Sequence, residues 1–350
     1  MNTVRVNASQ SYDIIIGSNL IRNTGKYIHN IAPNAKVAII SDSNVWPLFG
    51  QTIIDSLSGA GISAVSFVFS AGESSKNPNT YLQILNFLAE NEITRTDMII
   101  ALGGGVVGDM AGFAAATYLR GIPYVQMPTS LLAMVDSSVG GKTAIDLPAG
   151  KNLVGAFKQP KLVICDVDTL SSLPETVFLD GCAEIIKYGM LYDPELIQYL
   201  LQTGPSFDRE VVITKCVTFK RDVVQEDEFD TGNRQKLNFG HTIGHGIEAG
   251  SNFKITHGCA VAAGMAIVTK AAESCGLCKL DVYTTLRNLL VKFSLPTTTD
   301  MCADGLYQIM LSDKKRSGNT VTLIIPRKLG HCDCIPTPLA ELQSFIKAGL

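Results

Sequence analysis

The stretch Asp97-Met-Ile-Ile-Ala-Leu-Gly-Gly-Gly-Val-Val-Gly-Asp109 decides the fold of the first half of the chain. Its apolar run at residues 98–102 predicts a buried strand, and the glycines behind it predict a tight turn into a helix. Gly103, Gly105 and Gly108 satisfy G-x-G-x-x-G, in which glycines let backbone N–H groups approach a pyrophosphate. A bare match is as often a plain turn, so it predicts only a candidate dinucleotide site.

Similar apolar runs recur on both sides of this stretch. Helical patterns such as residues 81–90 separate them, and this alternation predicts a mostly parallel sheet with helices on its faces. Residues 4–6 and 12–17 predict a hairpin at one edge of the sheet. The further strands are expected at residues 37–40, 65–69, 124–127 and 162–165.

After Leu173-Pro174 the pattern changes to long apolar runs at helical spacing, with one short strand expected at residues 321–326. We therefore expect an α/β fold. A Rossmann-like, mostly parallel sheet domain should occupy residues 1–173, and a mainly α-helical domain should occupy residues 174–350.

Composition excludes several classes of protein. The chain has 350 residues and a net charge of −3, so a general nucleic-acid-binding surface is not expected. Residues 98–119 are apolar, but five glycines and Asp109 interrupt them, which argues against a membrane span. The N-terminus has no apolar signal region, and nine cysteines are typical of free thiols, so we expect a cytoplasmic protein.

Polar residues follow several of the predicted strands. The acidic residue usual about 20 residues after the glycine pattern is missing, but Asp42 follows an earlier strand and could bind an adenosine ribose. Gly141-Lys142-Thr143 resembles the end of a P-loop. The first glycine of that motif is replaced by Asp136, which disfavours ATP hydrolysis and leaves Lys142 as a candidate phosphate ligand.

Three of the five histidines lie within residues 241–257. His241 and His245 are one helical turn apart on one face, so the pattern alone predicts a metal held by these two and a third group. Ordinary surface or core histidines are an equally good interpretation. Glu184, with Lys187 one turn on, is either a surface pair or part of a site. The Cys-x-x-Cys at 275–278 and the Cys-x-Cys at 332–334 are interpreted as incidental.

Taken in order, several blocks closely resemble the 3-dehydroquinate synthase family of sugar-phosphate cyclases, from about residue 42 to residue 315. The chain departs from the family pattern at Thr176-Val177, where Arg-Glu is usual, and at Cys259, where Glu is usual. The blocks that carry the resemblance are Gly72-Glu73 with Lys76, residues 103–109, residues 128–143, residues 150–157, Ala183-Glu184-Ile-Ile-Lys187-Tyr-Gly, Leu237-Asn238-Phe-Gly-His241-Thr-Ile-Gly-His245, His257-Gly258 and Asp313-Lys314-Lys315.

The resemblance implies NAD and a Zn²⁺ or Co²⁺ ion as cofactors. The metal ligands it implies are Glu184, His241 and His257, with His245 acting on the substrate. The cofactor-binding positions it implies are Asp42, Asn44, Glu73, Lys76, Gly103, Gly104, Gly105, Asp109, Thr129, Ser130, Asp136, Lys142, Lys151 and Ser172.

The resemblance also implies a substrate pocket and a homodimer. The catalytic positions are Asp136, Lys142, Lys187, Lys220, Arg234, Asn238 and His245. The substrate-binding positions are Lys151, Asn152, one of Lys314 or Lys315, and Arg120, which is expected to reach the phosphate site of the neighbouring subunit.

The expected reaction converts 3-deoxy-D-arabino-heptulosonate 7-phosphate to 3-dehydroquinate and phosphate, in the shikimate pathway. Alternatives are another cyclase such as 2-deoxy-scyllo-inosose synthase, a metal-dependent polyol dehydrogenase, or a non-catalytic NAD-binding module. The hexose phosphate of the first has no carboxylate, so Lys220 and Arg234 argue against it. A polyol dehydrogenase would lack so many phosphate-binding cations and would release NADH.

Overall fold

The structure is a computed structural model that describes residues 1–314 and 319–350. Its contacts divide the chain into two compact units. Unit 1 contains Met1–Pro174 and Arg209–Phe229, and unit 2 contains Glu175–Asp208 and Asp230–Leu350. An α/β fold with a mostly parallel sheet and a helical C-terminal region is confirmed.

Unit 1 is built on a seven-stranded sheet in the order β1-β2-β9-β6-β5-β3-β4. Only the edge pair β1–β2 is antiparallel, as expected for the N-terminal hairpin. The strands are β1 (Asn2–Val6), β2 (Tyr12–Gly17), β3 (Val37–Asp42), β4 (Ala64–Phe69), β5 (Met98–Gly103), β6 (Tyr124–Pro128) and β9 (Leu162–Asp166). The helices of unit 1 are α1 (Thr24–Ile31), α2 (Trp46–Gly59), α3 (Pro78–Glu90), α4 (Gly105–Thr117) and α7 (Arg209–Glu226).

Apolar side chains cover both faces of the central strands, which is why these strands are continuous apolar runs. On one face, Ile39 and Ile100 pack in a core cluster with residues of α1 and α2. On the other face, Ile40 and Ile99 pack with residues of α3 and α4. The alternation of neighbouring residues between the two clusters follows from the period of two in a strand.

The strand order places a topological switch point between β3 and β5. From β3 the chain first adds β4 on one side and then β5, β6 and β9 on the other. Ser41 of β3 pairs with Leu102 of β5, so Asp42 and Gly103 come at the same end of adjacent parallel strands. Doubly wound sheets bind ligands outside the carboxyl ends of their strands at such a point.

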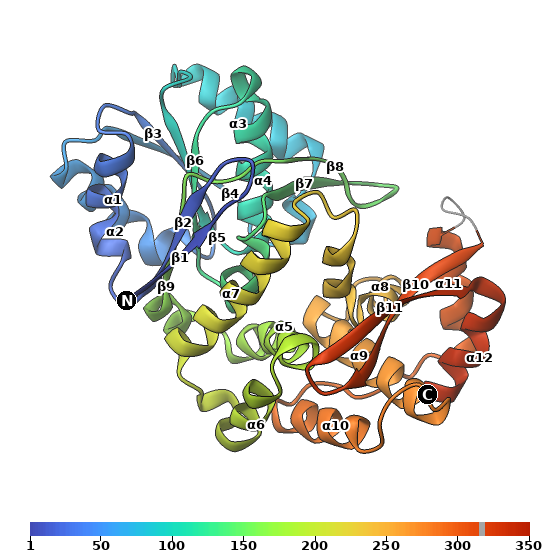
Figure 1. Ribbon diagram of the computed structural model, residues 1–350. Helices are drawn as coiled ribbons and strands as arrows, with labels where there is room; N and C mark the ends of the chain where they lie inside the picture. Colours follow the sequence, from blue (N-terminus) through green and yellow to red (C-terminus); the bar gives the residue numbers. More distant parts are fainter. Residues whose placement is uncertain (315–318) are drawn as a thin grey trace. The chain divides into compact units, whose positions relative to one another are not determined.

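A second hairpin begins at the P-loop-like residues 141–143. Lys142 is the first residue of β7 (Lys142–Leu147), which pairs with β8 (Gly150–Phe157) as a separate two-stranded ribbon. Figure 1 shows this ribbon in green beside α4. A P-loop lysine opens a helix, whereas Lys142 opens a strand, which agrees with the expectation that this segment is not an ATP-hydrolysing P-loop.

Helix α7 belongs to unit 1, although it lies after residue 173 in the sequence. It packs against β1 and β2, and the N-terminal ammonium of Met1 lies 2.6 Å from the Glu210 carboxylate. Val212, Ile213 and Val217 are among its buried residues. A helical period predicts such an apolar face but does not say which sheet the face covers.

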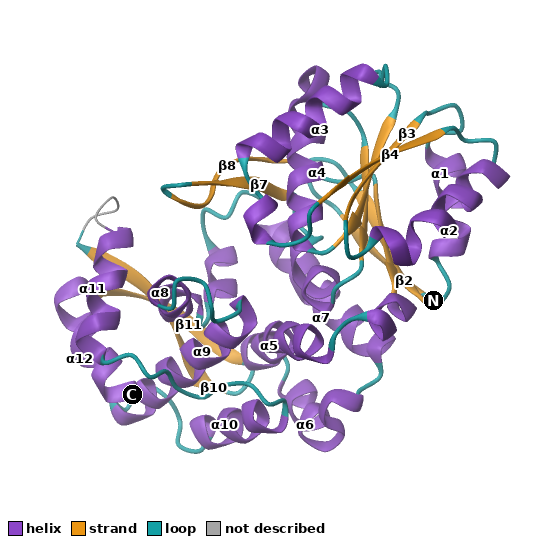
Figure 2. Cartoon of the chain, turned by 180° about the vertical axis from the view of Figure 1, so that it is seen from behind, coloured by secondary structure: helices purple, strands orange, loops and turns teal. Residues whose placement is uncertain are grey.

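Unit 2 is mainly helical, with a single described hairpin that Figure 2 shows in orange among purple helices. The sequence predicted one strand at 321–326, but β10 (Thr320–Lys328) pairs with β11 (His331–Pro338). The helices of unit 2 are α5 (Glu175–Tyr192), α6 (Pro194–Thr203), α8 (His241–Gly250), α9 (His257–Ser274), α10 (Val282–Lys292), α11 (Ala303–Lys314) and α12 (Leu339–Gly349). Within the part of the chain that the structure describes, no helix has both the length and the apolar content to cross a bilayer.

Candidate functional site

Three helices of unit 2 bring a carboxylate and two imidazoles together. Glu184 of α5, His241 at the start of α8 and His257 at the start of α9 offer ligand atoms that all lie within 4.8 Å of one another. Glu184 Oε1 is 3.6 Å from His241 Nε2 and 3.8 Å from His257 Nε2. Glu184 is completely buried, which is costly for a charge unless a cation or hydrogen-bond donors face it.

The other ring nitrogen of each histidine fixes its tautomer. His241 Nδ1 lies 3.2 Å from the carbonyl oxygen of Phe239, and His257 Nδ1 lies 3.3 Å from Glu248 Oε2. A carbonyl or carboxylate oxygen can only accept, so each Nδ1 carries a proton and donates it. In a neutral ring the lone pair is then on Nε2, which faces Glu184. Two such lone pairs and a carboxylate oxygen that face one another are suited to bind a cation among them.

This donor set fits a Zn²⁺ or Co²⁺ ion. Catalytic zinc sites use about three nitrogen or oxygen ligands from the protein and leave a position open for water or substrate. Metal-binding histidines almost always donate the other N–H to a carboxylate or a carbonyl, as His257 and His241 do to Glu248 and Phe239.

The charges around the cluster act differently on the two histidines. Burial, followed by the nearby charge of Lys187, holds the pKa of His241 well below its usual value, which favours the neutral ring that binds metals. Burial also lowers the pKa of His257, but the hydrogen bond to Glu248 and the charge of Glu184 outweigh burial and raise it. The Lys187 ammonium, itself buried, contacts the second carboxylate oxygen of Glu184.

The His-x-x-x-His pattern alone selects a different pair. His241 and His245 have ring centroids 5.6 Å apart, but no candidate metal cluster among the described residues contains both. His245 is exposed and groups instead with Glu248 and His257. The structure therefore brings together the three residues that the resemblance implied and not the pair that the spacing suggested.

Sequence reasoning missed Glu248, although its signal is present. Glu248 follows His245 by three residues on α8, so His241, His245 and Glu248 lie on one face of this helix. Its buried carboxylate accepts from His257, which lies on another helix. The pattern could have shown an acid on the histidine face, but not which histidine it would contact.

In unit 1, the glycine turn lies at the switch point. Gly103 ends β5, Gly105 begins α4, and the carbonyl oxygen of Gly103 accepts from Thr129 N, directly after β6, at 3.0 Å. A Cβ atom at Gly104 would lie 3.4 Å from Ser130 Oγ, so backbone and hydroxyl approach closely here. The backbone N–H groups at the start of α4 are suited to bind a phosphate.

Two other predicted cofactor positions, Asp42 and Ser172, lie at the end of β3 and in the 3₁₀ helix after β9. Asp42 Oδ1 accepts from Asn44 N at 2.8 Å and from Val45 N at 3.0 Å, which holds this carboxylate at the end of β3. Ser172 is exposed at the end of the 3₁₀ helix that follows β9 and donates its hydroxyl to Thr169 O at 2.8 Å.

A polar cluster links the loop after β4 to hairpin β7–β8. Lys76 Nζ lies 2.6 Å from Asp109 Oδ2 and donates to Asn152 Oδ1, and Lys151 Nζ is 3.8 Å from Glu73 Oε1. Burial raises the pKa of Asp109 to about 6, against the opposing charge of Lys76. Burial lowers the pKa of Lys76, but the charge and hydrogen bond of Asp109 and the charge of Glu73 act against burial and leave it raised.

Asp136 lies in a π-helical turn, residues Ala133–Ser137, a geometry frequent at functional sites. Lys220 of α7 is buried, contacts the Asp136 carboxylate and donates to its backbone oxygen at 2.7 Å. The packing of α7 in unit 1 therefore brings Lys220 to Asp136, a contact that sequence separation hides.

The remaining predicted residues are placed as follows. Arg234 is buried and lies with Asn238 in the 3₁₀ helix Asn233–Asn238 that leads into α8. Arg120 is exposed, with a left-handed φ of 66°. Lys142 is exposed at the start of β7. The side chain of Lys314 and all of Lys315 lie outside the described residues.

Comparison with known proteins gives a consistent result over the whole chain. Residues 66–180 match the family described as 3-dehydroquinate synthase N-terminal, and residues 181–316 match 3-dehydroquinate synthase C-terminal. The chain is 43% identical over 343 residues to a 3-dehydroquinate synthase of Streptococcus suis, covering 96% of this chain and 97% of the relative. It is also 43% identical over 354 residues to the enzyme of Clostridium acetobutylicum, covering 99% of each chain.

Solved structures also match nearly the whole length of the chain. The crystal structure of 2-deoxy-scyllo-inosose synthase complexed with carbaglucose-6-phosphate, NAD⁺ and Co²⁺ matches with a TM-score of 0.90 at 25% identity, covering 100% of each chain. Glycerol dehydrogenase from Schizosaccharomyces pombe matches with a TM-score of 0.69 at 18% identity, covering 96% of this chain and 88% of that one. The second likeness is one of fold.

Proposed function

The chain belongs to the 3-dehydroquinate synthase family of enzymes, and we propose that it converts 3-deoxy-D-arabino-heptulosonate 7-phosphate to 3-dehydroquinate and phosphate. The reaction comprises transient NAD-dependent oxidation at C5, β-elimination of phosphate, reduction and intramolecular aldol closure. The observation that carries the proposal is the convergence of Glu184, His241 and His257 on one point beside the buried Lys187, in a chain 43% identical to such enzymes over its length.

The proposed cofactors are NAD and a Zn²⁺ or Co²⁺ ion. The switch point of unit 1, with Asp42, the glycine turn and Thr129-Ser130, supports NAD binding there. Glu184, His241 and His257 would hold the metal in unit 2. When bound, NAD supplies a reversible hydride acceptor and the metal a Lewis acid.

Each unit by itself carries cations that suit an anionic substrate. In unit 1 these are Lys142, Lys151 and Lys220, and in unit 2 they are Lys187 and Arg234. An arginine can bind a carboxylate with two parallel hydrogen bonds, whereas a lysine acts as a point charge. A heptulosonate phosphate offers such cations both a carboxylate and a phosphate, whereas a hexose phosphate has no carboxylate.

Proton transfer is the proposed role of His245 and of the Asp136–Lys220 pair. His245 is exposed and close to the cluster, with its ring centroid 6.1 Å from that of His257, and an imidazole can hold or release a proton near neutral pH. Asn238, just before α8, is proposed to orient the substrate, together with Asn152 in β8.

We also propose a homodimer in which Arg120 reaches the phosphate site of the partner subunit. Arg120 is exposed, and its left-handed φ of 66° is followed by Gly121 at 116°. A non-glycine residue in this region is strained, and such strain collects at functional positions. The cytoplasmic location stays a prediction.

The test is to incubate the purified protein with the heptulosonate phosphate, NAD⁺ and Zn²⁺ or Co²⁺. We expect phosphate and 3-dehydroquinate in equal amounts. Glucose 6-phosphate serves as the competing substrate. Turnover of glucose 6-phosphate without turnover of the heptulosonate would assign the chain to the inosose-forming cyclases instead.

A further inference from the structure

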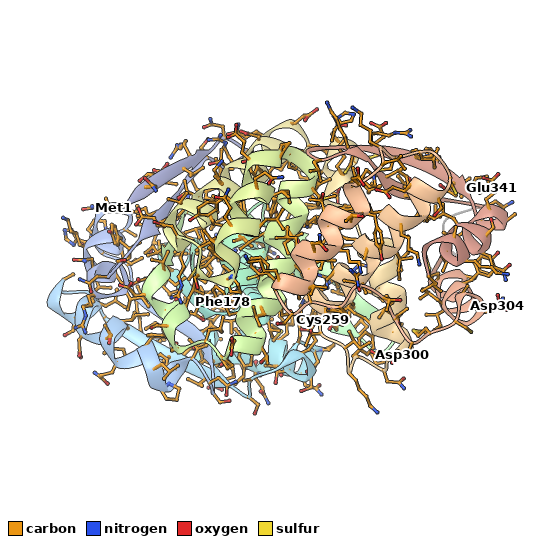
Figure 3. The ribbon with its side chains drawn as sticks, turned by 90° about the horizontal axis from the view of Figure 1, so that it is seen from below. Met1, Phe178, Cys259, Asp300, Asp304 and Glu341 are labelled. Carbon is orange, nitrogen blue, oxygen red and sulfur yellow. The ribbon has the colours of Figure 1, made fainter. Side chains whose placement is uncertain are left out.

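The metal ligand His257 is the first residue of α9, so its position depends on how this helix begins. Thr256 is the N-cap residue, but its hydroxyl does not cap the helix. Instead, Thr256 Oγ1 donates to Asp180 Oδ1, and the same oxygen accepts from the backbone N–H of Cys259 at 2.9 Å. The first turn of α9 is thus capped by a carboxylate from a different helix. Figure 3 labels Cys259 on α9 and Phe178 on α5, the helix that carries Asp180.

Asp180 is placed to connect this cap with the metal cluster. It precedes Glu184 by one helical turn on α5, so both side chains lie on the same face of that helix. The Asp180 carboxylate contacts Thr256 and Cys259, which lie before and after His257 in the sequence. The Glu184 carboxylate faces the ring of His257.

The two helices meet closely at this point. A Cβ atom at Gly258 would lie 2.0 Å from the backbone oxygen of Asp180, so only glycine fits between them. The close approach leaves the start of α9 little freedom to shift while the cap is in place.

The local sequence explains why an external cap is needed. A helix that begins with Thr can close its own capping box when Glu or Gln stands three residues later. Here that position holds Cys259, whose thiol is a poor acceptor. In a capping box the Thr256 hydroxyl would accept from the N–H of residue 259, and the acid at residue 259 would accept from the backbone N–H of Thr256. In this chain Asp180 replaces the Thr256 hydroxyl as the acceptor for the N–H of residue 259, and the hydroxyl itself donates to Asp180.

We propose that Asp180 is a positioning residue for the metal site: it caps α9 from α5 and thereby holds His257 opposite Glu184. The inference rests on the metal site proposed above. It predicts that the loss of Asp180 weakens metal binding, and that a capping box built into α9 itself restores it.

The experiment measures the Zn²⁺ affinity of full-length, metal-free protein by competition with a chelating dye, together with its thermal unfolding. Asp180→Ala should weaken zinc binding about tenfold, the lower end of the range for residues that orient ligands. Asp180→Asn keeps an acceptor oxygen and should stay within about threefold of the parent. Adding Cys259→Glu to Asp180→Ala completes Thr-x-x-Glu and should recover most of the affinity.

Asp193→Ala is the matched control. Asp193 caps α6 in the same unit by accepting from Leu196 N at 3.0 Å, so its loss should lower the unfolding temperature without changing zinc affinity. The inference is overturned if Asp180→Ala binds zinc as the parent does, if Asp193→Ala loses as much affinity, or if Cys259→Glu fails to rescue. Failure of the parent itself to bind zinc would instead remove the metal site on which the inference rests.

Discussion

His241→Ala and His245→Ala should affect metal binding very differently, although both residues lie on α8 one turn apart. His241 Nε2 lies 3.6 Å from Glu184 Oε1 in the proposed ligand set, whereas His245 is exposed and outside that set. The two variants form a matched pair, because each replaces the same residue type by alanine in the same helix.

The size of the difference follows from the number of ligands. Zinc binding to sites with about four protein ligands contributes roughly 10–16 kcal/mol, or about 3 kcal/mol for each ligand. Losing His241 should therefore weaken zinc affinity by about 100-fold or more. Losing His245 leaves Glu184, His241 and His257 in place and should cost less than about tenfold, while lowering turnover by roughly 10²–10⁴ through the loss of a proton-transfer group.

The assay is zinc content per subunit after dialysis against chelators of graded strength. Circular dichroism of each metal-free variant controls for unfolding, since His241 is the more buried residue. If His245→Ala loses zinc as readily as His241→Ala, the reasoning from the tautomers is refuted and the His-x-x-x-His pair holds the metal.

Three further outcomes are expected. After bound cofactor is removed, product should exceed added NAD⁺, because the hydride taken at C5 is returned; NADH formed one-for-one with product would indicate a polyol dehydrogenase. When the inactive Arg120→Ala and Lys142→Ala variants are mixed, heterodimers should form that contain one intact active site and so recover activity. If subunits demonstrably exchange but no activity returns, the proposal that Arg120 acts in the partner subunit's site is contradicted. Burial raises the pKa of Asp109 to about 6, so the folded state holds this proton more tightly than the unfolded state. Stability should therefore fall as the pH rises from about 4 to 6, by at most about 1.4 kcal/mol per pH unit, and Asp109→Asn should flatten this slope in urea unfolding.

The sequence by itself determined the local structure of unit 1. The strands that begin at Val37, Ala64, Met98, Tyr124 and Leu162 were predicted to within a few residues. Their continuous apolar runs and the glycine turn after β5 are local signals, because a strand buried on both faces needs apolar side chains at every position. The motif blocks also predicted the family, because several blocks of matching residues occur in the family's order along the chain.

Only the tertiary structure decided how distant residues combine. The His-x-x-x-His spacing places His241 and His245 on one helix face, but the packing of α5, α8 and α9 brings Glu184 to His241 and His257. In the same way, α7 returns to unit 1 and carries Lys220 to Asp136. The period of a helix fixes which side chains share a face, whereas the partner of that face is chosen by packing over the whole chain.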